Sequence, residues 1–327
     1  MSLVVSKIKL EDVHDEFETL LDNIQELLVE SGSKTKISST KLGVYKKMLK
    51  DTEQIGPEEF ANLIAIINRY KELNIFFEKQ NNIIFDNKDL IKIIEGKALL
   101  DDSQEEFNNT FFELSMAIRF SKAFDKDLFK IDLTTICDLI INESVAIECK
   151  YIHGKNRLEE NIKKAIEQIN SRVENGLAKF GIIALDISNL IDKEKVRKFS
   201  QEIFQEFVCS IEKLEKNSFC SEIIKKGGVY SSVINNSNFR KIIHSFSAHC
   251  LEQKFNESLH KNLKIRINNE KNVVAIIFQS YDNFCFEYQN ILYPLPNRGL
   301  TYYINENLDE RRHDRIEKII HSLAVGV

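Results

Sequence analysis

The chain has 327 residues, of which 43% are hydrophobic and 29% are charged, and this composition excludes an extensively disordered or fibrous protein. With three prolines and eleven glycines, long irregular stretches are not expected and helix should dominate. The net charge of −5 is not that of a protein that coats nucleic acid without specificity, although a local basic strip could still bind nucleic acid.

No apolar run approaches the roughly 20 residues that are needed to cross a bilayer, and the first residues turn acidic too soon for a secretory signal. The six cysteines are scattered without close pairs, which is typical of reduced thiols. These features predict a cytoplasmic protein with no membrane partner.

The first hundred residues are predicted to form a helical N-terminal region. Apolar residues recur at helical spacing from Val13 to Leu28, in a helix over 11–30 that ends near Gly32. A second helix is expected near 40–51, and a third over 58–73, after Pro57, a residue suited to an early helical position. A short segment at 89–96 leads to a polar break, and we place the boundary to the rest of the chain, 101–327, at residue 100.

The pattern changes beyond this boundary. An amphipathic helix is expected over 103–124, followed by strand candidates at 128–131, 134–143 and 144–152, with a turn at Asn142-Glu143-Ser144. A long helix over 156–175, stopped by Gly176, leads to a buried strand at 181–188. This order of helix, three strands, helix and strand predicts an α/β core over 103–190.

The C-terminal part, 191–327, is predicted to add both helices and strands. It reads as helical to about residue 262, with a break at 225–232. A strand at 272–280 and a β-segment at 283–295 then precede a charged helix at 308–324.

Three charged residues stand out in the core. Asp138 is expected in the middle of one apolar strand, and Glu148 and Lys150 share one face of the next strand, with Ile147 and Cys149 on the other face. A hairpin would bring Asp138 alongside the other two. Burying three charges costs free energy unless they pair or bind a cation. The alternative is a partly buried salt bridge at a strand edge.

These residues fit metal-assisted hydrolysis of phosphodiester bonds. Two carboxylates and the backbone carbonyl of Cys149 are hard oxygen ligands for Mg²⁺, with Mn²⁺ as a substitute. The metal would lower the pKa of a bound water and neutralise charge on the phosphate. Lys150 could orient this water, help to deprotonate it or stabilise the phosphate oxygens, and the sequence leaves these three roles open.

The acidic-x-Lys pattern carries little information without its context. Chance alone gives about seven acidic-x-basic matches in a chain of this composition. Other matches occur at 86–88, 95–97 and 252–254, but none lies in an apolar strand that follows an aspartate-bearing strand. The two adjacent strands therefore carry the prediction.

With this order of elements, residues 103–190 resemble the PD-(D/E)xK, or restriction-endonuclease-like, superfamily of nucleases. The resemblance implies an αβββαβ core with a mixed central sheet, with Asp138, Glu148 and Lys150 as its motif residues. It also implies a metal-assisting role for Glu113 on the first core helix and a catalytic role for Gln168 on the helix after the motif. Arg172 stands four residues after Gln168, where one branch of the superfamily has tyrosine, so no single family is indicated.

The resemblance implies a Mg²⁺-dependent endonuclease with DNA as its expected substrate, in bacterial restriction or phage defence. A ribonuclease with the same site is one alternative, and a non-catalytic nucleic-acid-binding or assembly subunit is another. The acidic net charge and the missing nucleotide-hydrolysis motif suggest a homodimer or a partner subunit for targeting.

Further polar residues surround the core motif. Basic residues that could grip phosphates are expected just beyond it, although a solvated turn explains them equally well: His153, Lys155, Arg157 and Lys164. For Asp186, capping of the next segment is favoured over a place in the site. His244, His249 and Cys250 lack the regular spacing of zinc ligands.

Overall fold

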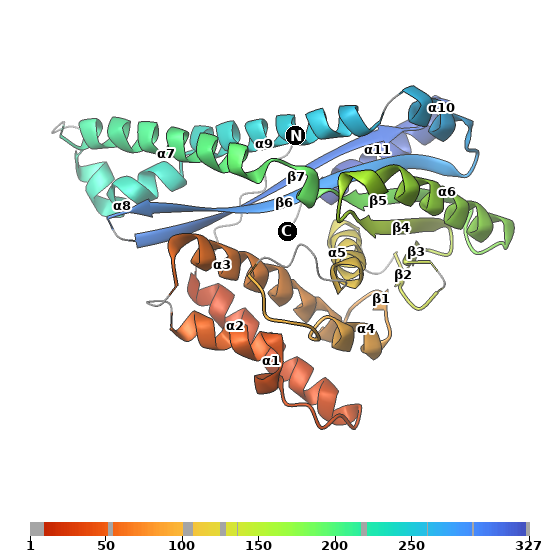
Figure 1. Cartoon of the computed structure of the whole chain (residues 1–327), viewed down its shortest axis with the longest axis horizontal. Coiled ribbons are helices and arrows are strands. Elements are labelled where there is room, and N and C mark those ends of the chain that lie inside the picture. Colours follow the sequence, from red (N-terminus) through yellow and green to blue (C-terminus); the bar gives the residue numbers. More distant parts are fainter. Residues whose placement is uncertain are drawn as a thin grey trace.

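A computed structural model of the chain describes residues 10–51, 55–100, 107–124, 129–135, 137–216, 221–259, 261–289 and 291–324. It is a mixed α/β structure, in agreement with the predicted class, in which helices cover both faces of one seven-stranded sheet (Figure 1). The strands lie in the sheet in chain order: β1 (Ile83–Ile84), β2 (Ile131–Asp132), β3 (Leu139–Ile141), β4 (Val145–Tyr151), β5 (Phe180–Asp186), β6 (Val273–Tyr288) and β7 (Ile291–Ile304).

The longer helices lie mainly before and after the core strands. In chain order they are α1 (Leu10–Glu30), α2 (Lys41–Lys50), α3 (Pro57–Lys71), α4 (Asn87–Lys92), α5 (Phe107–Ala123), α6 (Leu158–Glu174), α7 (Lys193–Glu215), α8 (Ser221–Ile234), α9 (Ser237–Ser258), α10 (Lys261–Asn269) and α11 (Glu310–Ala324). Short 3₁₀ turns are η1 (Ile37–Ser39), η3 (Glu72–Phe77), η4 (Lys155–Arg157) and η5 (Ser188–Leu190). No helix among these residues is long and apolar enough to cross a membrane.

The sheet is mixed in direction. Strand β3 runs antiparallel to both of its neighbours, β2 and β4, while β1 is parallel to β2. Strands β4, β5 and β6 are parallel, and β7 returns antiparallel to β6. Helix α6 makes the crossover that parallel neighbours such as β4 and β5 require. The predicted order of helix, three strands, helix and strand is found over α5 to β5.

Each face of the sheet has its own apolar core. Ile147 and Cys149 of β4 pack with α5 and the N-terminal helices in a cluster that runs from Val13 in α1 to Leu323 in α11. The opposite face packs against α6, α9 and α10, and Figure 1 shows α1–α3 and α5 on one side of the sheet and α6, α7 and α9 on the other. The first cluster contains residues from both sides of residue 100, so the N-terminal helices share a core with the sheet. The division into two regions at residue 100 stays a prediction.

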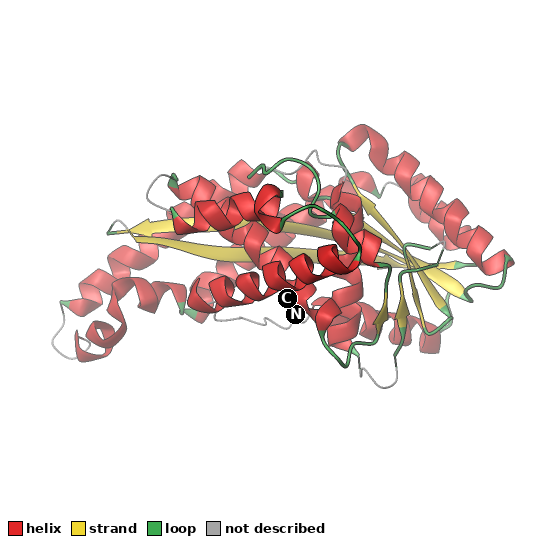
Figure 2. Ribbon diagram, turned by 90° about the horizontal axis from the view of Figure 1, so that it is seen from below, coloured by secondary structure: helices red, strands yellow, loops and turns green. Residues whose placement is uncertain are grey.

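The C-terminal strands form one long hairpin rather than the two separate segments that the sequence predicted. Residues 283–288 continue β6, the chain reverses near Gln289, and β7 continues to Ile304. The long strands extend away from the short ones, as Figure 2 shows, and pack against α7, α8 and α9. Because β7 is an edge strand, it tolerates Pro294 and Pro296, which have no N–H to donate to a neighbour.

The strands before the motif are shorter than predicted. Strand β3 begins only at Leu139, so Cys137 and Asp138 precede it and Asp138 does not lie in mid-strand. The hydroxyl of Thr135 accepts from the N–H of Cys137 at 3.3 Å, and such local bonds compete with strand pairing. The predicted turn after β3 is confirmed, with φ near 50° at Asn142 and Glu143.

Candidate active site

The site lies at an edge of β4 that β3 leaves open. Strand β3 pairs with β4 only as far as Ile147, so the next two N–H groups on this edge have no strand partner there. The N–H of Cys149 donates to Oδ2 of Asp138 at 2.6 Å, and the N–H of Tyr151 donates to Oδ1 of Asn109 in α5 at 3.2 Å. Because β3 begins only at Leu139, there is room beside β4 for Asp138. Its carboxylate accepts the hydrogen bond from Cys149 that a carbonyl of a neighbouring strand would otherwise accept.

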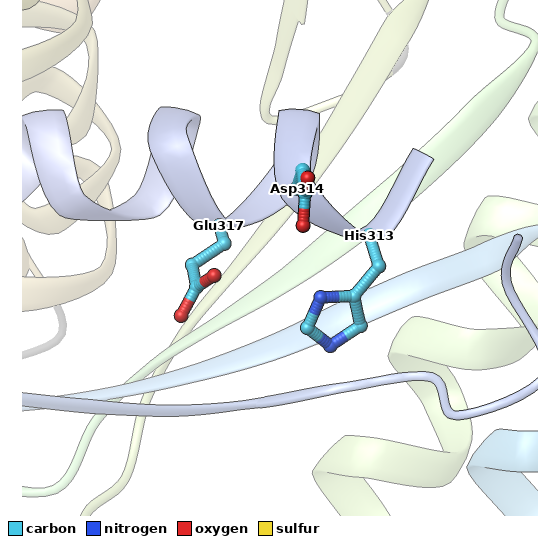
Figure 3. A group of neighbouring side chains, drawn as sticks. All are labelled: His313, Asp314 and Glu317. Carbon is cyan, nitrogen blue, oxygen red and sulfur yellow. The ribbon is translucent and has the colours of Figure 1, made fainter. Parts of the chain in front are cut away.

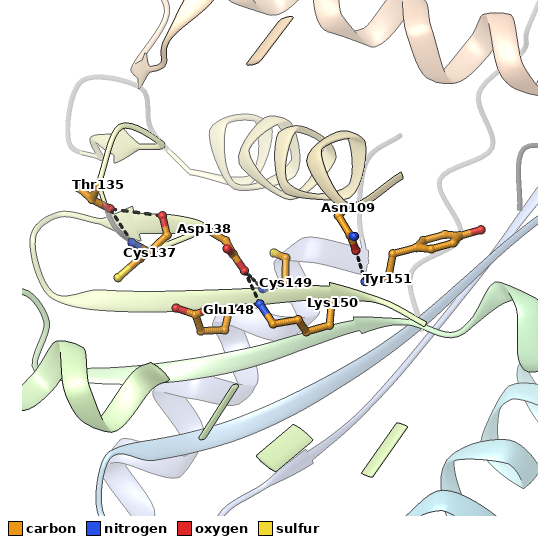
Figure 4. A network of polar contacts seen from close by, with 8 residues as sticks. All are labelled: Asn109, Thr135, Cys137, Asp138, Glu148, Cys149, Lys150 and Tyr151. Atoms are coloured by element: carbon orange, nitrogen blue, oxygen red, sulfur yellow. Dashed lines mark hydrogen bonds and ion pairs between the residues drawn. The ribbon is translucent and has the colours of Figure 1, made fainter. Parts of the chain in front are cut away.

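Asp138, Glu148 and Lys150 meet at this edge, as the sequence predicted (Figure 4). The ammonium of Lys150 lies 3.1 Å from Oδ2 of Asp138 and 3.3 Å from Oε2 of Glu148. The side chain of Glu148 is fully buried, and those of Asp138 and Lys150 are 18% and 19% exposed. Two carboxylates and one cation therefore share a small site that is partly exposed to solvent.

Glu148 has one oxygen without a hydrogen-bond partner among the described residues. Oε2 contacts Lys150, but Oε1 is buried and accepts no hydrogen bond in this part of the chain. A buried carboxylate oxygen without a partner is costly in free energy, and a bound cation would remove this cost.

Glu113 of α5 is influenced by the charges of the site. Burial raises the pKa of its half-buried carboxyl to about 8, with a further contribution from the charge of Asp138, while Lys150 acts in the opposite direction. The charges of Asp89 and Lys92 in α4 also act on it. The metal-assisting role that the resemblance implies for Glu113 stays a prediction.

The protonation states follow from this crowding. Burial and the charge of Asp138 raise the pKa of Glu148 to about 7, despite the opposing charge of Lys150. Burial lowers the pKa of Lys150, but the charges of Asp138 and Glu148 outweigh this effect and raise it above its usual value. At neutral pH Lys150 is thus a cation, while Glu113 and Glu148 hold protons for part of the time.

The residues fit a hard divalent cation. Asp138, Glu148 and Glu113 supply carboxylate oxygens, and the carbonyl of Cys149 points to the same edge as its N–H, which bonds to Asp138. The three carboxylates do not all lie within 4.8 Å of one another among the described residues. A cation bound here would therefore draw them together.

The sequence did not single out Arg172 as a site residue. It lies in the last turn of α6, just before Gly176 ends the helix with φ 73°. Its charge lowers the pKa of both Cys137 and Glu148, whose shifts are dominated by burial, so its guanidinium lies beside the site. The sequence feature that could have identified Arg172 is its position one helical turn after Gln168, on the same face of the helix.

Gln168 itself is half-buried, and no hydrogen bond or ion pair joins it to Asp138, Glu148 or Lys150 in this part of the structure. It lies on the helix face of Arg172, one turn earlier. Its catalytic role stays a prediction.

The residues that were expected to bind phosphate groups follow β4 in the chain: His153, Lys155, Arg157 and Lys164. The half-buried ring of His153 meets that of Tyr151 edge to face, with 5.1 Å between the ring centroids. Arg157 is exposed at the start of α6, and Lys164 is exposed and pairs with Glu160 at 2.6 Å. The side chain of Lys155 lies outside the described residues. The contact with nucleic acid stays a prediction for all four.

Asp186 caps the next turn, as the sequence favoured. Its Oδ1 accepts from the N–H and the hydroxyl of Ser188 at 3.0 and 2.5 Å, and its Oδ2 accepts from the amide of Gln279 at 2.8 Å. Its carboxylate therefore belongs to a polar network apart from Lys150. The described cysteines Cys137, Cys149, Cys209 and Cys250 are free thiols.

A second group of potential metal ligands lies on the surface of α11. His313, Asp314 and Glu317 bring one ligand atom each within 4.8 Å of the others (Figure 3). Glu317 already accepts from the hydroxyl of Tyr302 at 3.0 Å, and Asp314 is exposed. Exposed acidic groups commonly gather without an ion, so this group alone does not indicate a second metal site.

Comparisons with protein-family models, with curated proteins and with solved structures each gave no match to this chain. The interpretation of the site therefore depends on its own residues and geometry.

Proposed function

We propose that this chain is a metal-dependent nuclease that hydrolyses phosphodiester bonds, with DNA as its substrate class. The observation that carries the proposal is the meeting of Asp138, Glu148 and Lys150 at the open edge of β4, with one oxygen of Glu148 buried and unsatisfied. The order of elements from α5 to β5 supports a restriction-endonuclease-like core. A part in restriction or phage defence is an expectation from the resemblance alone.

Each residue has a role in this proposal. Asp138, Glu148 and Glu113 would hold Mg²⁺ or Mn²⁺, together with the carbonyl of Cys149. When bound, the cation supplies Lewis-acid stabilisation of the charge that develops on the phosphate. Lys150, whose pKa is raised, acts as a fixed positive charge that stabilises the phosphate oxygens rather than as a base.

The alternative is a purely structural role, in which Lys150 forms salt bridges with Asp138 and Glu148 that only stabilise the fold. Replacing a buried ion pair by apolar residues is often neutral or stabilising, so a purely structural role gives little reason for three charges. A structural role also leaves the buried Oε1 of Glu148 without a function. Both points favour a bound cation.

The test is a cleavage assay on plasmid, linear duplex, single-stranded DNA and RNA, with Mg²⁺, Mn²⁺ or a chelator. We expect cutting of DNA that requires the metal. Cutting of RNA alone would replace the substrate class but keep the site.

Metal binding is measured on the same protein by thermal unfolding. A cation at 100 times its Kd should add roughly 2.7 kcal/mol to the free energy of unfolding. No cleavage of any substrate and no stabilisation by either metal would together overturn the proposal and leave a non-catalytic subunit.

A further inference from the structure

A separate cavity of about 280 Å³ lies between α3, α5, the first turns of α7 and strands β4 to β7. Tyr151 of β4 lines it, one residue after Lys150, and neighbouring residues of a strand point to opposite faces. The cavity is therefore across the sheet from the side chains of Lys150 and Glu148. The nuclease proposal does not use it.

Four arginines line this cavity: Arg69 of α3, Arg119 of α5, Arg298 of β7, and Arg197 of α7, which pairs with Glu58 and Asp282. Arg119 is only 7% exposed, yet its guanidinium donates to the amide oxygen of Gln279 and contacts the sulfur of Met116 at 3.9 Å. Both partners are neutral. A buried arginine whose contacts are neutral groups keeps a charge that the fold has not compensated by a direct ion pair.

Arg69 and Arg298 are held in place by packing and by the backbone. The guanidinium of Arg69 lies 4.5 Å from the ring centre of Phe111 and 5.8 Å from that of Tyr281. Arg298 donates to the carbonyl of Leu323 at 2.8 Å. Such contacts fix the planar groups around the cavity before a ligand arrives.

The positive charges act on one another. Burial and the charge of Arg298 lower the pKa of Arg119, and Arg69 acts in the same direction, while Asp186 opposes them. Burial lowers the pKa of Arg298 to about 10. Arginine nevertheless keeps its proton at neutral pH, so the repulsion persists and an anion in the cavity would relieve it.

The carboxylates of the cavity wall are already engaged. Glu58 and Asp282 pair with Arg197, and Glu72 pairs with Lys122. Asp186 accepts from Ser188 and Gln279, as described above. Among the described residues, these four acids are each bonded to another group, and Arg119 has no acid paired with it.

We propose that this cavity binds a phosphate group through Arg69, Arg119 and Arg298. The planar fork of arginine matches two phosphate oxygens at once, and a phosphate monoester carries close to two negative charges at pH 7, more than one carboxylate. The volume suits a small phosphorylated molecule or the end of one strand and excludes a duplex.

The test is titration calorimetry of the full chain in chelator, so that no metal-dependent phosphate binding contributes. The probes are inorganic phosphate, adenosine monophosphate and two oligonucleotides that differ only in a 5′-phosphate. We expect one phosphate site per chain and a Kd that rises at least about tenfold in Arg119→Gln, because a charge-assisted bond is lost. Tighter binding of the free phosphates indicates a small ligand, and tighter binding of the phosphorylated oligonucleotide indicates a strand end.

Two further variants make the result specific. Arg69→Gln, at a half-buried position, replaces Arg119→Gln if circular dichroism shows that the latter is unfolded. Arg312→Gln, at an exposed position of α11, should leave phosphate binding unchanged. No binding of any probe to the wild type, or equal affinity in a folded cavity variant, would overturn the proposal.

Discussion

The ammonium nitrogen of Lys150 lies 3.1 Å from Oδ2 of Asp138, although 12 positions in the chain separate the two residues. The same ammonium lies 3.3 Å from Glu148, so a positive charge stands between two carboxylates. In the proposed function, a divalent cation competes with Lys150 for these oxygens. Four measurements follow from this competition and from the crowding of charge around it.

The first concerns the stability of the metal-free protein. The pKa of Glu148 is raised to about 7 in the fold, so between its unfolded value of 4.5 and about 7 the folded state binds more protons than the unfolded state. Its contribution to stability is therefore present below pH 4.5 and is lost as pH rises through 7. We expect Glu148→Gln to gain about 1–3 kcal/mol over the wild type at pH 8 and little at pH 5.

Urea unfolding in chelator from pH 5 to 8 measures this difference. Glu174→Gln, an exposed change in α6, serves as the control and should follow the wild type. If the free energy of unfolding changed with pH in the same way for wild type and Glu148→Gln, Glu148 would not be ionising in a crowded site, and the prediction would be wrong.

The second prediction concerns the protons that metal binding displaces. Glu113, with a pKa raised to about 8, and Glu148, with a pKa raised to about 7, must ionise before they can act as ligands. We expect Mn²⁺ affinity to rise from pH 6 to pH 8 and binding at pH 6.5 to release about one to two protons. Calorimetry in buffers of different ionisation enthalpy counts the protons, and pH-independent binding would contradict this account.

The third prediction concerns Arg172. Its charge lowers the pKa of Glu148, so its removal should raise that pKa further and shift metal binding to higher pH. We expect Arg172→Ala to show this upward shift and Arg172→Lys to restore part of the wild-type profile, since lysine keeps the charge. A downward shift, or an identical profile in all three proteins, would remove Arg172 from the site.

The sequence was sufficient to predict that Glu148 and Lys150 lie on the same face of β4, because side chains alternate between the two faces of a strand. The role of Glu113, which the resemblance implies for one position on the first core helix, stays a prediction. The sequence could not predict where β3 begins, because this depends on a local hydrogen bond between Thr135 and Cys137. Asp138 was therefore expected in mid-strand but lies just before it.

Other features were hidden because they arise only from packing. Arg172 is an ordinary helical residue in the sequence, and only the crossover of α6 brings it to Glu148. The long β6–β7 hairpin was predicted only in part, because the predicted β-segment at 283–295 runs through the turn near Gln289 and stops before residues 296–304, which also pair with β6. The cavity of Arg69, Arg119 and Arg298 joins three elements that are far apart in the chain.

The most direct test of the central claim is the initial rate of cleavage of one linear DNA by wild type and Lys150→Ala at saturating Mn²⁺. Lys271→Ala, at an exposed position outside the site, is the matched control. We predict that Lys150→Ala keeps its fold but loses at least about 100-fold in rate, as expected when a charge that stabilises the transition state is removed, while Lys271→Ala keeps the wild-type rate. Cleavage at equal rates by wild type and Lys150→Ala would contradict the account.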